Sequence, residues 1–135
     1  MITGLNGLDD NMKKIMVVDD EPDQIYTLKY SLEGAQEEFE LIPANSAMEC
    51  LQKLSSGILP DIILLDIMMP EMSGWELYEK IRDNSKYNDI PIVFLTARGD
   101  KIAKNAGRFL GNDYVEKPYD IKDLIKRIND ILDKK

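Results

Sequence analysis

The chain has 135 residues, enough for one domain with a buried core, and 44% of them are hydrophobic, as in a globular protein. Its net charge of −8 argues against direct nucleic-acid binding, and the absence of histidine excludes histidine-based catalysis, histidine metal sites and a phosphohistidine on this chain. No apolar run is long enough to span a membrane, and a single cysteine, Cys50, allows no intrachain disulfide, so we expect a cytoplasmic protein that does not bind membranes.

The N-terminal residues lack the apolar core of a signal peptide. We expect residues 1–13 to form a flexible leader and residues 14–135 to form a single domain. The domain opens with a short, β-prone apolar run at residues 15–18, which predicts a strand that ends at Asp19 and Asp20.

Helical and extended patterns then alternate along the chain. A helix is expected after Pro22, where apolar residues repeat at helical spacing as far as Gly34, and a strand follows at residues 39–44. Asn45 or Ser46 can cap the helix that comes next.

The stretch at residues 61–74, DIILLDIMMPEMSG, organises the rest of the chain. Its four consecutive branched apolar residues predict a strand that is covered on both faces, as in a parallel sheet. The strand ends at Asp66, which should therefore lie at the carboxyl edge of the sheet, where open α/β sheets bind ligands. Taken alone, Asp66 could equally be a turn residue ahead of Pro70.

The second half of the chain continues the alternation. A helix is expected from Ser73 or Gly74, with Trp75, Tyr78 and Ile81 on one side. The remaining predicted elements are a strand at residues 92–95 that ends at Thr96, a helix of weaker pattern at 102–110, a strand at 113–115 that ends near Lys117, and a strongly amphipathic helix after Asp120. Five strands alternating with five helices predict an α/β fold, a single doubly wound five-stranded parallel sheet flanked by five helices.

Polar residues follow four of these strands, and the parallel arrangement should gather them at one edge. They are Asp19 and Asp20, Asp66, Thr96 and Lys117. Each alone could be a turn residue, a strand end or a solvated charge. Together, carboxylates about 4 Å apart would repel by roughly 4 kcal/mol at an effective dielectric of about 20, so a cation should bind, and the oxygen donors suit Mg²⁺. An aspartate, Mg²⁺ and a lysine together serve phosphoryl transfer to a carboxylate.

Four sequence blocks resemble the receiver domain of two-component response regulators: VVDDEPD at 17–23, LLDIMMPEMSG at 64–74, LTA at 95–97 and DYVEKPY at 113–119. The resemblance extends from Lys14 to about Leu132 and implies the flavodoxin-like, CheY-like fold. It implies a signalling domain that catalyses only its own phosphorylation and dephosphorylation. Its partners would be a histidine kinase or phosphotransfer protein and a downstream effector protein. The family also allows weak homodimers.

The resemblance assigns a role to each residue at the sheet edge. Asp66 would be phosphorylated, and Asp19, Asp20, Asp66 and the backbone carbonyl of Met68 would bind Mg²⁺. The phosphoryl group would be contacted by Thr96 and Lys117, while Thr96 and Tyr114 would act as the switch. The loop before Tyr114 is one residue shorter than the family often has, which affects the output surface more than the chemistry.

Two other functions fit parts of the pattern. One is a receiver that only docks partners and is never phosphorylated, which would fail to bind Mg²⁺. The other is a phosphatase with an aspartyl nucleophile. Such haloacid-dehalogenase-like enzymes need an acid two residues after the nucleophile, where this chain has Met68.

Overall fold

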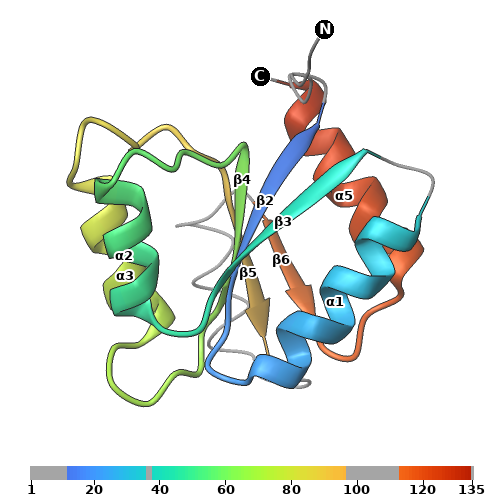
Figure 1. The fold of residues 1–135 in the computed structure, drawn as a ribbon, viewed down its shortest axis with the longest axis horizontal. Helices are drawn as coiled ribbons and strands as arrows, with labels where there is room; N and C mark the ends of the chain where they lie inside the picture. The colour runs from blue at the N-terminus through green and yellow to red at the C-terminus, as the bar shows by residue number, and fades with distance from the viewer. Residues whose placement is uncertain (1–11, 36–37, 97–112, 135) are drawn as a thin grey trace, which may run out of the picture.

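The computed structural model describes residues 12–35, 38–96 and 113–134. Five strands form one parallel sheet in the order β3-β2-β4-β5-β6 (Figure 1). The strands are β2 (Lys13–Val18), β3 (Phe39–Ala44), β4 (Ile62–Asp66), β5 (Ile92–Thr96) and β6 (Asp113–Glu116). The predicted five-stranded parallel sheet is thereby confirmed.

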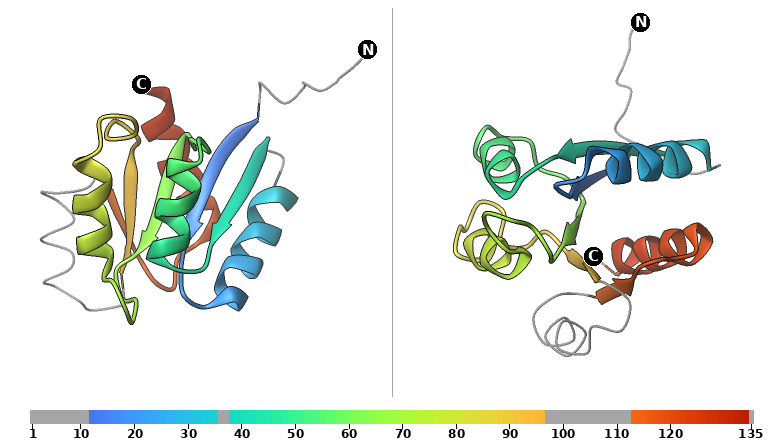
Figure 2. Two further views of the ribbon diagram at one scale, coloured as in Figure 1. Left: turned by 60° about the vertical axis from the view of Figure 1, so that its left-hand side comes forward. Right: turned by 90° about the horizontal axis from the view of Figure 1, so that it is seen from below.

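Helices cover both faces of the sheet, as a doubly wound arrangement requires (Figures 1 and 2). The described residues contain four of them: α1 (Pro22–Gly34), α2 (Ala47–Ser55), α3 (Gly74–Arg82) and α5 (Ile121–Asp133). Helices α1 and α5 lie on one face, and α2 and α3 lie on the other. The fifth predicted helix, at 102–110, falls in a segment outside the described residues. Among the four described helices, none combines the length and the apolar character needed to cross a membrane.

Strand β2 starts at Lys13, two residues before the apolar run from which it was predicted. Lys13 joins the ladder because it pairs with Phe39 of β3, and its ammonium group donates a hydrogen bond of 2.7 Å to the Asn129 side chain. Most of the predicted leader, residues 1–11, lies outside the described residues.

At the starts of α2 and α3, side chains satisfy free backbone N–H groups. Ser46, rather than Asn45, caps α2 by accepting a hydrogen bond from the N–H of Glu49. Ser73 and Glu76 form a reciprocal capping box at the start of α3. These caps fix where the loops that follow β3 and β4 end.

The core consists of two apolar layers, one on each face of the sheet. Every residue of β4 is buried, with Ile63 and Leu65 in one layer and Ile62 and Leu64 in the other, which confirms a strand covered on both faces.

The predicted side of α3, with Trp75, Tyr78 and Ile81, packs against one core layer. Leu77 and Ile81 are its fully buried side chains, whereas Trp75 and Tyr78 are half-buried. Both rings pack against Phe94 of β5, with ring centroids 4.6 and 5.5 Å from it, so they cover the edge of the core instead of filling its centre.

Candidate functional site

Strand register brings the predicted acidic residues together. Val18 of β2 pairs with Leu65 of β4, so the residues that follow, Asp19 and Asp66, lie at the same level of the sheet. Both are buried, with 2% and 7% of their surface exposed. One carboxylate oxygen from each of Asp19, Asp20 and Asp66 lies within 4.8 Å of the other two. The predicted carboxylate cluster is therefore present at the carboxyl edge.

Lys117 reaches this cluster from the loop after β6. Its ammonium nitrogen lies 3.3 Å from Oδ2 of Asp19 and 3.8 Å from Oδ2 of Asp66. The side chain is one quarter exposed, although its ammonium nitrogen contacts two buried carboxylates. Among the described residues, this ammonium group contacts two of the three clustered carboxylates.

Backbone N–H groups hold the other oxygens of the two buried carboxylates. The N–H of Met68 donates to Oδ1 of Asp66 at 3.1 Å, and the N–H of Glu21 donates to Oδ1 of Asp19 at 3.0 Å. Each aspartate therefore turns Oδ1 toward its own loop and Oδ2 toward Lys117. These two N–H groups were not predicted from the sequence, although an aspartate that accepts a hydrogen bond from the backbone two residues on is a common turn.

Asp66 has a strongly altered proton affinity. Burial raises the pKa of its carboxyl group to about 6. The ammonium group of Lys117 and the Met68 N–H lower the pKa, while the negative charges of Asp19 and Asp20 raise it. The charged form of the buried carboxyl group is thus disfavoured, and a hard divalent cation bound by these carboxylate oxygens would stabilise it.

Gly74 allows the loop after β4 to fold back on the strand end. A Cβ atom at this position would lie 2.7 Å from the carbonyl oxygen of Asp66 and 2.7 Å from Cα of Ile67. Its N–H donates to the carbonyl of Ile67 at 3.0 Å. The lack of a side chain here sets the path of the backbone that carries Asp66.

The remaining predicted residues are placed by their strands. Thr96 ends β5 directly after Leu95, which is the register partner of Asp66, so its backbone lies at the same edge. The side chain of Thr96 is not among the described features. Tyr114 pairs with Phe94, further from the edge, and its half-buried ring packs against one core layer.

A family model described as the response regulator receiver domain matches residues 15–129. A CpxR homologue of Haemophilus influenzae, a transcriptional regulatory protein, is 38% identical over 90% of this chain and 51% of its own length. The PhoP regulator of alkaline phosphatase synthesis from Bacillus subtilis is 36% identical over 89% of this chain and 48% of its own length. The chain thus spans about half the length of these relatives.

Solved structures show the same fold. A putative response regulator from Chloroflexus aurantiacus superposes with a TM-score of 0.81 at 34% identity, and the match covers 89% of this chain and 97% of that one. The chemotaxis protein CheY4 of Vibrio cholerae gives a TM-score of 0.75 at 28% identity, over 88% and 98% of the two chains.

Proposed function

The chain belongs to the response regulator receiver domain family, and on this premise we propose that Asp66 accepts a phosphoryl group from a phosphohistidine of a partner protein. An oxygen of Asp66 attacks phosphorus, the bond from phosphorus to the imidazole nitrogen breaks, and the electron pair stays on that nitrogen. Water later attacks the aspartyl phosphate and releases inorganic phosphate, which returns the carboxylate. The observation that best supports this proposal is that the Asp66 carboxylate is buried beside two further acids and Lys117.

The two oxygens of Asp66 have different contacts. Oδ1 accepts the Met68 N–H, and Oδ2 faces Lys117 across 3.8 Å. We propose that Lys117 pairs with the phosphoryl oxygens as a point charge and that the hydroxyl group of Thr96 donates a hydrogen bond to them. Asp19, Asp20, Asp66 and the carbonyl of Met68 would hold Mg²⁺. Bound there, Mg²⁺ offsets negative charge on the phosphoryl oxygens.

Phosphorylation would be communicated to other proteins through a change in the binding surface of the domain. Phosphorylation adds negative charge at the strand edge, which attracts Thr96 and Lys117 and lets the ring of Tyr114 move inward. The surface that includes β6 and α5 would then bind a downstream effector protein. A histidine kinase or phosphotransfer protein would supply the phosphoryl group in the cytoplasm, and homodimers, if they form, would be weak.

Mass spectrometry of the intact chain tests the phosphoacceptor. Incubation with acetyl phosphate and Mg²⁺ should add the mass of one phosphoryl group to the wild type and none to Asp66→Asn. Asp89→Asn is the matched control, because Asp89 is an exposed turn residue, and it should gain mass like the wild type. An undiminished gain in Asp66→Asn, or no gain in the wild type, would refute the assignment.

A further inference from the structure

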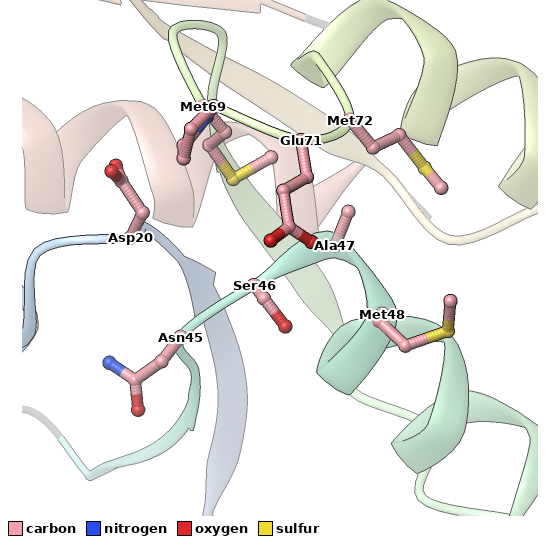
Figure 3. A pocket seen from close by; sticks show the side chains of 9 residues that line it. Asp20, Asn45, Ser46, Ala47, Met48, Met69, Glu71 and Met72 are labelled. Atoms are coloured by element: carbon pink, nitrogen blue, oxygen red, sulfur yellow. The ribbon is translucent and has the colours of Figure 1, made fainter.

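A pocket of about 400 Å³ lies beside the acidic cluster, between the loops that follow β3 and β4 (Figure 3). Asp20 belongs to both the cluster and the pocket wall. The volume is near the small end of the range for ligand sites, about 300–1,000 Å³, which suits one or two side chains better than a large cofactor.

Three methionines line this pocket. Met48 stands at the first turn of α2 with 57% of its surface exposed, although it is a large apolar residue. Met69 and Met72, from the loop after β4, are half-buried and pack against the core. Methionine side chains are flexible and polarisable, and they recur on surfaces that adapt to partner side chains. This wall can therefore accommodate an apolar stem.

Two acids give the pocket its charge. Asp20 lies on one side, and Figure 3 shows the Glu71 side chain extending from the loop after β4 toward Ser46 and Ala47. Among the described residues that line the pocket, none is a lysine or arginine. Lys117 forms its ion pairs with Asp19 and Asp66, and within the described ranges neither Asp20 nor Glu71 has an ion-pair partner. The negative charge of this pocket therefore favours a cationic group supplied by a binding partner.

We propose that this pocket binds a basic, amphipathic segment of a partner protein. The stem of a lysine or arginine lies against the methionines, and its charge lies between Asp20 and Glu71, since such side chains bury an apolar stem and keep the charged end near water. The inference rests in part on the proposed function, because Asp20 is also a proposed Mg²⁺ ligand. Docking and Mg²⁺ binding should therefore weaken each other, and by linkage they must do so by the same factor.

The direct test is NMR of the full chain labelled with ¹³C in the methionine methyl groups, titrated in EDTA with a short blocked peptide that alternates leucine and arginine. The methyl signals of Met48, Met69 and Met72 should shift, while that of Met16, which is fully buried, should not. The same peptide with glutamine in place of arginine should bind at least about fivefold more weakly. Unmoved pocket signals, or equal binding of the neutral peptide, would overturn the proposal.

Two variants distinguish a specific contact of the peptide with the pocket from a general effect of the protein's negative charge. Glu71→Gln should weaken peptide binding about two- to fivefold, as expected for a partly exposed ion pair. Glu79→Gln removes the same charge from an exposed position of α3 outside the pocket and should leave the affinity unchanged. Equal effects of the two variants would overturn a specific site.

The coupling between peptide binding and Mg²⁺ binding can be measured separately. Saturating the protein with Mg²⁺ should lower the peptide affinity about fivefold, within the usual range of coupling between sites. Peptide binding without metal does not depend on phosphorylation, and mass gain with acetyl phosphate does not depend on the peptide. Failure of docking and failure of the phosphoacceptor assignment are thus distinguishable.

Discussion

Replacing Asp66 with asparagine should stabilise the metal-free protein at neutral pH. The pKa of Asp66 rises from 3.8 to about 6 on folding, mainly because the carboxylate loses water. At about 1.4 kcal/mol per pKa unit, the charged form costs at most about 3 kcal/mol of folding free energy. Asparagine keeps the shape and can still accept the Met68 N–H, but it loses the attraction of Lys117. We therefore expect the substitution to raise the free energy of unfolding by about 1 to 3 kcal/mol.

The effect should depend on pH in a defined direction. Because the pKa of Asp66 is higher in the folded state, the folded protein binds more protons than the unfolded chain between pH 3.8 and about 6. The stability that neutral Asp66 contributes is fully present below pH 3.8 and is lost as the pH rises through about 6. The gain in free energy of unfolding of Asp66→Asn over the wild type should be small below pH 3.8 and reach a plateau above pH 6.

Urea denaturation in EDTA across this pH range measures the difference. Asp89→Asn, the exposed control, should show no comparable pH-dependent gain. Adding Mg²⁺ at neutral pH should stabilise the wild type and narrow its deficit against Asp66→Asn, because a ligand of the folded state stabilises it by mass action. A difference that does not change with pH, or an asparagine variant that is less stable at neutral pH, would refute the electrostatic account.

Two further predictions concern packing. Gly74→Ala should lower the free energy of unfolding in urea by roughly 2 kcal/mol or more, because the new Cβ would overlap the Asp66 carbonyl, whereas Gly34→Ala, with nothing within 4 Å, should be neutral or stabilising. If Gly34→Ala destabilised the protein as much as Gly74→Ala, the loss at Gly74 could not be attributed to its close approach to the Asp66 carbonyl. The Cys50 thiol, whose pKa burial raises to about 12, should react with iodoacetamide only after unfolding, and rapid alkylation of the native protein would show that it is accessible.

The sequence was sufficient to place the site because parallel strands have one common edge. Once β2, β4 and β6 were recognised, the positions of Asp19, Asp66 and Lys117 followed from where each strand ends. The depth of burial of each side chain on α3 did not follow, because Trp75 and Tyr78 fit helical spacing as well as Leu77 does. Trp75 and Tyr78 pack against Phe94 and remain half-buried, whereas Leu77 is fully buried. The choice of Ser46 over Asn45 as cap likewise depends on backbone angles that either residue can adopt.

Asp66 is a turn residue and a member of the charged site at once, so the two explanations offered by the sequence do not compete. Its hydrogen bond from the Met68 N–H is the one a turn aspartate makes. A turn needs no burial, however, and an exposed aspartate could make the same bond without a raised pKa. The burial of Asp66 beside Asp19 costs stability that the turn does not require. Sites that sacrifice stability in this way are typical of function, and here the carboxylate that bears the cost also contacts Lys117.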